Sequence, residues 1–130
     1  MDAKEGCLAL LARDITVHLQ NGDPKSDIYT VPTGKKMIPA MVIIRDPTAS
    51  LAGATDVDLG DGANADTWRN TISLTTMTTV NDFMVISAIV AVPVKYTIYD
   101  AGDVFGVKPV TGAVLDADAK ADLVGYLYDV

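Results

Sequence analysis

The hydrophobic and polar positions between Tyr29 and Asp46 predict two strands joined by a turn. The turn is Pro32–Gly34, where proline fixes φ and glycine allows a positive φ, so that the chain can reverse direction. The following strand, Met37–Ile44, is apolar on both faces. Regular alternation places Met37, Met41 and Ile43 on one face and Ile38, Ala40, Val42 and Ile44 on the other. Because a strand of this kind is covered on both faces, we expect a second sheet on one side and a neighbouring subunit on the other.

Further strands are predicted along the rest of the chain. Ile15–Leu19 and Thr55–Leu59 alternate between apolar and polar positions, as half-buried strands do. Phe83–Val92 is a second strand that is apolar on both faces. The remaining predicted strands are Asn70–Thr75, Val94–Tyr99, Val104–Val110 and Leu123–Tyr128. We therefore predict an all-β protein, a jelly-roll-like two-sheet β-sandwich of about eight antiparallel strands.

Two turns and one loop have recognisable chemistry. Asp100-Ala101-Gly102 stands before a strand in the same way as Pro32–Gly34, which predicts two hairpin-like corners in related positions of the sandwich. Residues 60–67 form a loop rich in Gly, Asp and Asn. Trp68, the only tryptophan, is expected to anchor this loop to the core.

The N-terminal segment differs from the rest of the chain. Residues 1–13 have the only helix-like spacing of apolar residues, with Cys7, Leu8, Leu10 and Leu11 on one stripe. This segment is either a short helix or an apolar arm that docks on a neighbour. We therefore expect an N-terminal arm or short helix over residues 1–14 and a single β-sandwich domain over residues 15–130.

Composition excludes several classes of protein. The 130 residues carry a net charge of −7, and the basic residues are scattered, which argues against nucleic-acid binding. The single cysteine, Cys7, allows no intrachain disulfide bond and is expected to be a small buried apolar residue. We expect no signal peptide, and the longest apolar run is too short to span a bilayer. A soluble protein made in the cytoplasm of a cell is expected.

The residues that catalysis would need are few. His18, the only histidine, lies on the polar face of a predicted strand, where a surface or hydrogen-bonded role is expected. A Ser-His-Asp site stays open, although no G-x-S-x-G motif is present. A thiol dyad of Cys7 and His18 would need the N-terminal segment to lie beside a cleft. One His and one Glu are too few for a cupin metal centre. We expect no enzymatic activity and no cofactor.

The best metal candidate is a calcium site at Asp56, Asp58 and Asp61, with Asn64 and Asp66 nearby. The calcium-loop pattern fails, because Gly60 takes the third ligand position and Thr67 stands where a Glu is needed. Turns with hydrogen bonds from Asp and Asn side chains explain the same residues. The sequence therefore predicts no metal site, with these aspartates as the calcium alternative.

Four segments resemble a group of small virion proteins of tailed bacteriophages: VPTGKK at 31–36, VIIRDPTA at 42–49, DVDLGDGANADTW at 56–68 and YDAGDVFGVK at 99–108. A closing strand with Gly125, Tyr126 and Leu127 completes the resemblance, which covers roughly residues 28–128. The resemblance implies a jelly-roll-like structural protein on the capsid exterior, made in the host cytoplasm. It implies a capsid decoration (cement) protein that forms a homotrimer and binds the major capsid protein over junctions between capsomers.

The residues themselves favour the same role. Two strands with two apolar faces exceed what one small core needs, so the surplus is expected between subunits. Three alternatives remain: a head-fibre, tail or receptor-binding module whose loops 60–67 and 111–120 contact a sugar, a small β-sandwich enzyme, and an inner-virion scaffold that touches DNA. The missing acid, base and metal groups disfavour the enzyme, and the negative charge disfavours DNA. No nucleic acid or membrane is expected as a partner.

Overall fold

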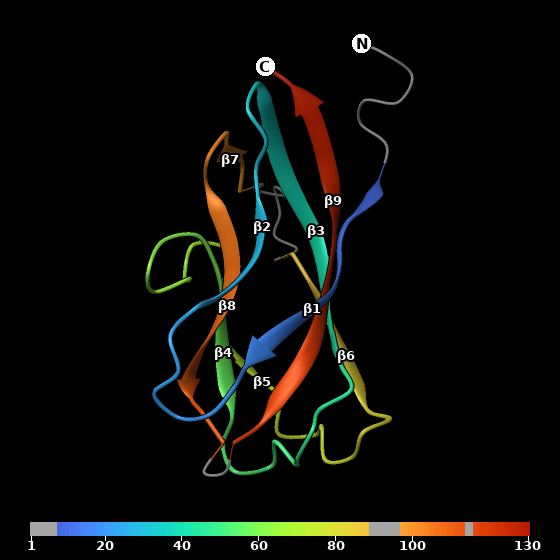
Figure 1. Cartoon of the computed structure of the whole chain (residues 1–130), viewed down its shortest axis with the longest axis vertical. Coiled ribbons are helices and arrows are strands. Elements are labelled where there is room, and N and C mark those ends of the chain that lie inside the picture. The colour runs from blue at the N-terminus through green and yellow to red at the C-terminus, as the bar shows by residue number, and fades with distance from the viewer. Residues whose placement is uncertain (1–7, 89–96, 114–115) are drawn as a thin grey trace.

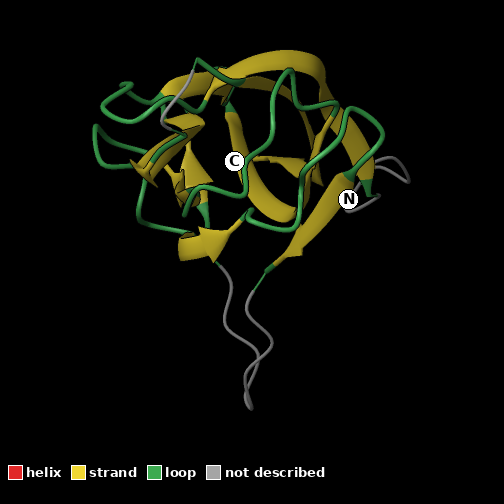
Figure 2. Ribbon diagram, turned by 90° about the horizontal axis from the view of Figure 1, so that it is seen from below, coloured by secondary structure: helices red, strands yellow, loops and turns green. Residues whose placement is uncertain are grey.

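The protein folds as two antiparallel sheets packed face to face, as seen in a computed structural model that describes residues 8–88, 97–113 and 116–130 (Figure 1). Strands enclose a common interior, and none of the described residues is helical (Figure 2). The five-stranded sheet contains β1 (Ala9–His18), β3 (Lys35–Arg45), β6 (Phe83–Ser87), β7 (Tyr99–Asp100) and β9 (Asp118–Asp129). The four-stranded sheet contains β2 (Ser26–Thr30), β4 (Asp56–Gly60), β5 (Arg69–Ser73) and β8 (Val104–Thr111). Within residues 8–88, 97–113 and 116–130, no helix is long and apolar enough to cross a membrane.

The order of the strands is that of a jelly roll. The sheets read β1-β9-β3-β6 and β2-β8-β4-β5, and β7 is a short addition beside β3. Three antiparallel pairs are nested around the β4–β5 hairpin: β3 with β6, β2 with β8, and outermost β1 with β9. This nested folding of one long hairpin into two sheets is the jelly-roll arrangement. The prediction of an all-β, jelly-roll-like sandwich is therefore confirmed.

The core lies between the two sheets and consists mostly of aliphatic side chains. Three aromatic residues pack inside it: Trp68 and Tyr99 each contact Phe105 edge to face, with ring centroids 5.5 and 5.7 Å apart. All three are nearly fully buried. Trp68 therefore anchors the 60–67 loop to the core, as the sequence predicted.

A β-bulge changes which side chains of β3 face the core. The pairing of β3 with β9 shifts register between Pro39 and Met41, so one extra residue lies opposite β9 at this point. Before the bulge Met37 is buried, and after it Val42 and Ile44 are buried. The predicted grouping of Met37 with Met41 and Ile43 on one face is therefore wrong. Met41 and Ile43 lie on the outer face of the five-stranded sheet.

The two predicted corners lie next to each other. Both connect one sheet to the other: Pro32–Gly34 joins β2 to β3, and residues 101–103 join β7 to β8. The backbone N–H of Val31 donates to the carbonyl of Asp103 at 3.0 Å, and the N–H of Gly102 donates to the carbonyl of Val31 at 2.9 Å. Gly34 and Gly102 both have a positive φ, which explains glycine at each corner. The similar motifs therefore mark two crossings that are hydrogen-bonded together.

The helix alternative for the N-terminal segment is wrong over residues 9–13, which belong to β1. Two register shifts interrupt the pairing of β1 with β9, one between Leu10 and Ala12 and one between Ala12 and Ile15. These irregularities break the period of two, and the spacing that remains is close to that of a helix. The expected boundary at residue 14 falls inside β1. The rest of this prediction, on residues 1–7, lies outside the described residues.

The predicted strand over 83–92 is shorter in the structure. β6 ends at Ser87, and residues 89–92 lie outside the described part of the chain. The predicted strand over 94–99 also begins outside it, and only Tyr99 and Asp100 form β7.

Candidate functional site

His18 lies at the end of β1, where it pairs with an acidic residue of β9. Its Nδ1 is 2.8 Å from an oxygen of Asp118, and its side chain is 58% exposed. This hydrogen bond raises the pKa of His18 above its ordinary value. Ser26 is also close, but its hydroxyl accepts a hydrogen bond from the backbone N–H of His18 and not from the ring. In a Ser-His-Asp site the serine hydroxyl donates to the imidazole, whereas here the hydroxyl of Ser26 accepts from the backbone of His18.

Cys7 lies outside the described residues, so the structure does not place it relative to His18. The histidine itself is on an exposed strand surface, as the sequence predicted.

The three aspartates of the calcium alternative point to separate hydrogen-bond donors. Asp58 accepts from the backbone N–H of Thr71 at 2.7 Å, and Asp61 accepts from the hydroxyl of Thr67 at 2.6 Å. Asp56 lies 3.4 Å from the hydroxyl of Thr111. Among residues 8–88, 97–113 and 116–130, no three His, Cys, Asp or Glu side chains form a group that could hold a metal ion. The calcium alternative therefore has no geometric support.

The 60–67 loop is fastened by a short polar chain that ends in the core. Asp61 accepts from Thr67, and the Thr67 hydroxyl is 2.7 Å from the hydroxyl of Tyr99 on β7. Burial raises the pKa of Tyr99 to about 12. A side chain at Gly60 would lie 2.7 Å from the backbone nitrogen of Thr67, so glycine is required there. Segment 99–108 thus contacts both segment 31–36 and segment 56–68: its corner is hydrogen-bonded to Val31, and Tyr99 is hydrogen-bonded to Thr67.

The outer face of the five-stranded sheet carries several neighbouring apolar side chains. In one row across the sheet, Met41 of β3 lies opposite Val124 of β9, which lies opposite Leu10 of β1. In the next row, Ile43 of β3 lies opposite Val85 of β6. Residues opposite one another in a sheet share a face and touch. This set of five residues is called the apolar face below.

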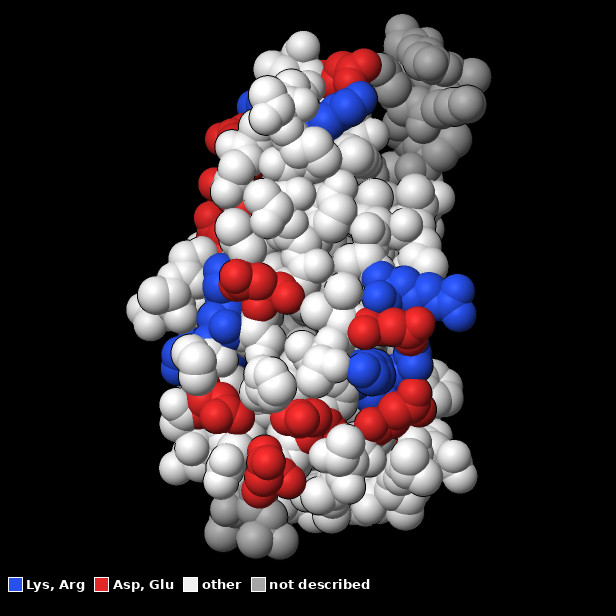
Figure 3. All heavy atoms as spheres, in the orientation of Figure 1, with Lys and Arg blue, Asp and Glu red and all other residues white. Residues whose placement is uncertain are grey.

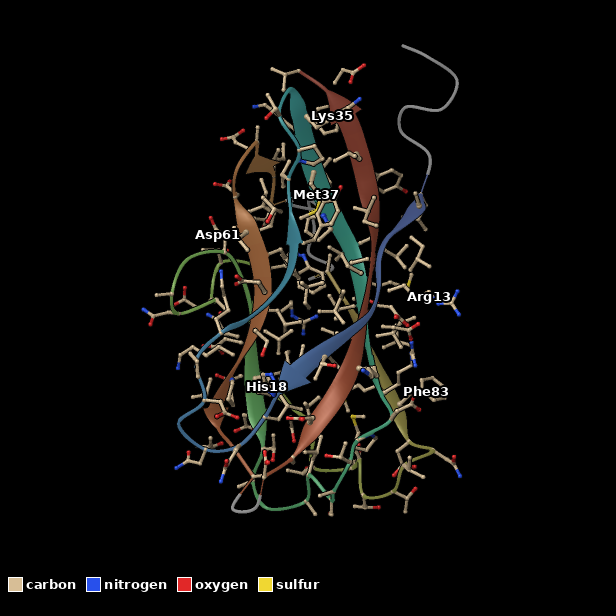
Figure 4. The ribbon with its side chains drawn as sticks, in the orientation of Figure 1. Arg13, His18, Lys35, Met37, Asp61 and Phe83 are labelled. Atoms are coloured by element: carbon tan, nitrogen blue, oxygen red, sulfur yellow. The ribbon has the colours of Figure 1, made fainter. Side chains whose placement is uncertain are left out.

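Side chains at both edges of the apolar face are strongly exposed. Leu10 at the β1 edge is 55% exposed, and Val85 at the β6 edge is 47% exposed. Phe83, two residues before Val85 on the same strand, is 67% exposed. Figure 4 shows Phe83 and Arg13 projecting from the same side of the molecule. Scattered apolar residues are ordinary on a protein surface, whereas a contiguous patch across several strands indicates an interaction site.

A network of charged side chains lies on the same outer face, where Asp122 of β9 is opposite Ile43 and Arg45 of β3 is opposite Phe83. Arg45 on β3 donates from Nε and Nη2 to the two oxygens of Asp122 on β9, at 2.9 and 3.1 Å. It also donates to Asp46 at 2.7 Å and to Asp14. Asp122 also accepts from the backbone N–H of Asp14 at 2.9 Å. The network joins β1, β3 and β9.

The charges in this network shift one another's ionisation. Hydrogen bonds to Asp122, then Asp14, raise the pKa of Arg45, and the hydrogen bond from Arg45 lowers the pKa of Asp122.

Asp14 and Asp46 both have a positive φ, which is uncommon for residues other than glycine and which aspartate tolerates better than most. The sequence analysis did not find this network. The one feature of the sequence that could have indicated the network is Asp122, a charged residue that directly precedes the apolar run Leu123–Val124.

The two sheets differ in charge. Arg13, Arg45 and Lys120 are matched in number by Asp14, Asp46 and Asp122 on or directly after β1, β3 and β9. Figure 3 shows positive and negative groups next to one another at the right of the view, on the side of the five-stranded sheet. The strands and loops of the four-stranded sheet carry the larger share of unbalanced carboxylates, which include those of Asp56, Asp58, Asp61 and Asp66.

Of three comparisons with known proteins, one finds a similar fold. A scan against known protein families and a search of curated proteins give no match. One solved structure, "Cyanophage Pam1 capsid asymmetric unit", contains a similar chain: the TM-score is 0.59, the identity is 11%, and the alignment covers 100% of this chain and 90% of that chain. At this identity the likeness shows the fold alone.

Proposed function

We propose that this chain is a structural protein of a tailed-bacteriophage virion, of the capsid decoration (cement) type. It forms a homotrimer on the capsid exterior and binds the major capsid protein of the assembled lattice. The observation that carries this proposal is the apolar face, which is exposed at both edges in the isolated chain. A surface of this kind belongs to a protein whose role is to be covered by other protein.

Two further observations support a role in the capsid. The alignment with a chain of the cyanophage capsid structure covers nearly all of both chains, so the two have nearly the same length as well as the same fold. Two of the virion-like motifs fasten the 60–67 loop to the core, through the hydrogen bond of Thr67 to Tyr99 and the contact of Trp68 with Phe105. Such motifs fit a protein whose function is mechanical.

Decoration stabilises a shell by mass action. A protein that binds only the assembled lattice adds free energy that grows with occupancy, about 2.7 kcal/mol per site when its concentration is 100 times the dissociation constant. A trimer that sits over a junction engages several capsid subunits at once, so weak individual contacts multiply. A net charge of −7 keeps the unbound protein soluble despite its exposed apolar residues.

The proposal is tested with heads of the parent phage that assemble without this protein. The purified full-length chain is mixed with expanded heads and centrifuged through a sucrose gradient, with bovine serum albumin as a control for trapping. We expect the chain to sediment with the heads in a saturable manner and to raise the temperature at which they break open. Failure to sediment with heads would refute the proposal. Binding to host cells or to glycans instead would support the fibre, tail or receptor-binding alternative.

A further inference from the structure

We propose that copies of this chain meet around a three-fold axis through the outer face of the five-stranded sheet, with the β6 edge of one copy packed against the β1 edge of the next. This inference rests on the homotrimer of the proposed function and names the surface that forms it. The apolar face (Leu10, Met41, Ile43, Val85, Val124) and Phe83 supply the contact.

Charge favours a second copy over a basic partner. The chain as a whole has 10 basic and 17 acidic residues, yet the strands of this sheet carry five of each: Arg13, Lys35, Lys36, Arg45 and Lys120, and Asp14, Asp100, Asp118, Asp122 and Asp129. Two acidic proteins repel one another wherever unbalanced carboxylates meet, and here they do not meet. Arg45 already has partners within its own chain, so covering this face leaves it paired. A basic partner would instead fit the four-stranded sheet, where the carboxylates are in excess.

The size of the face suits a stable contact. β9 has twelve residues and runs through the middle of the sheet. At about 3.3 Å per residue and about 4.8 Å between strands, four strands of this length cover at most about 750 Å² of flat area. The shorter flanking strands reduce this area, and the relief of the side chains increases the surface that solvent touches. A ring of three divides this face between two contacts, so the two contacts of each copy together cover about as much area as each partner contributes to one standard interface, about 800 Å².

The distribution of exposed apolar residues favours a three-fold over a two-fold arrangement. A two-fold contact joins the same patch on both copies, whereas a closed ring of three joins two different patches of each copy. The sheet has β1 at one edge and β6 at the other. Leu10 projects at the first edge, and Phe83 and Val85 project at the second. Each copy therefore has exposed apolar side chains at both edges of the sheet, and a ring would join one edge to the other.

A matched pair of variants tests the surface. Val85 and Val110 are 47% and 48% exposed, and Val110 is on β8 of the other sheet. Val85→Arg places an unpaired charge in the proposed contact and should weaken self-association on the order of 100-fold, measured by sedimentation equilibrium. Val110→Arg should leave the trimer unchanged. A trimer that tolerates Val85→Arg, or that is lost equally with Val110→Arg, would overturn the inference. Circular dichroism confirms that both variants fold.

Cross-linking tests the symmetry. In a Cys7→Ser background, Leu10→Cys and Val85→Cys are purified separately, unfolded and refolded together, and oxidised. The proposed ring predicts disulfides between the two variants in the mixture, and few when either variant is alone. Cross-linking of Val85→Cys with itself would indicate a two-fold contact and overturn the inference. Binding to heads is measured separately, so a trimer with a different interface would leave the proposed function intact, and a trimer that ignores heads would leave the interface intact.

Discussion

Replacing Arg45 by methionine tests how far the charged network holds β1, β3 and β9 together. Met keeps most of the apolar length of the Arg side chain and removes the guanidinium. Asp122, whose side chain is only 12% exposed, then loses both hydrogen bonds from Arg45 and keeps only the one from the backbone of Asp14. The variant therefore leaves a largely buried carboxylate without its counter-charge.

The expected loss of stability follows from these contacts. Breaking a fully buried ion pair costs about 3–5 kcal/mol. The side chain of Arg45 is 25% exposed, so water partly replaces it beside Asp122, and we expect a loss of about 2 kcal/mol. With an unfolding entropy of about 2.1 cal/mol/K for each of the 130 residues, this loss lowers Tm by about 7 °C.

The loss should depend on pH in one direction. Arg45 lowers the pKa of Asp122 in the folded protein below its ordinary value of 3.8. The stabilisation is therefore complete above pH 3.8 and disappears as the pH falls through the lowered pKa, where the folded carboxyl takes up its proton. The difference between wild type and Arg45→Met should be constant from neutral pH down to about pH 5 and shrink below about pH 4.

Urea unfolding followed by circular dichroism measures both effects at one protein concentration, because self-association adds to stability. Arg13→Met is the control, since the side chain of Arg13 is 72% exposed and its ion pair with Asp14 is 3.4 Å long. The control should lose less than about 0.5 kcal/mol. The reasoning is refuted if Arg45→Met is no less stable than Arg13→Met at pH 7, or if its deficit is undiminished at pH 2.5.

Three other predictions concern the loop fastener and the histidine. Tyr99→Phe should lose about 1 kcal/mol of stability in thermal unfolding, and an unchanged Tm of this variant would contradict the prediction. The stability of the wild type should fall between pH 10 and 12, because burial raises the pKa of this tyrosine to about 12 in the folded protein. Gly60→Ala should lose about 3 kcal/mol because its side chain meets loop backbone, against about 1 kcal/mol for Gly62→Ala, which has a positive φ but open space; equal losses would count against the steric argument. In NMR titrations the His18 midpoint should lie above 6.5 and move toward it in Asp118→Asn, and a midpoint that ignores the substitution would show that the pair is not formed in solution.

The sequence predicted the sandwich because alternation and turn residues are local signals. It missed the bulge in β3, although Pro39 was a usable sign, since proline within a central strand occurs at bulges. The bulge decides that Met41 and Ile43 face outward, so the composition of the apolar face could not be assigned by alternation alone. A short helix was one of two alternatives for residues 1–13, because the two register shifts in β1 hide the strand period.

The candidate site was less predictable than the fold. Arg45 and Asp122 are 77 residues apart, and only the pairing of β3 with β9 brings them together. No local pattern encodes such a contact. The loop fastener was predicted in part, because a lone tryptophan after a glycine-rich loop indicates an anchor, but its hydrogen bond to Tyr99 depends on the crossing of the chain between the sheets.

The nested pairing of strands also determines when the protein can fold. β9 lies between β1 and β3, so the five-stranded sheet cannot be completed until residues 118–129 have left the ribosome. Until then β1 and β3 are exposed strands whose partner is still being synthesised, and closing a loop of more than one hundred residues is slow. The nascent chain must therefore avoid aggregation until β9 has emerged, and loss of the twelve residues of β9 would leave the sheet divided in two.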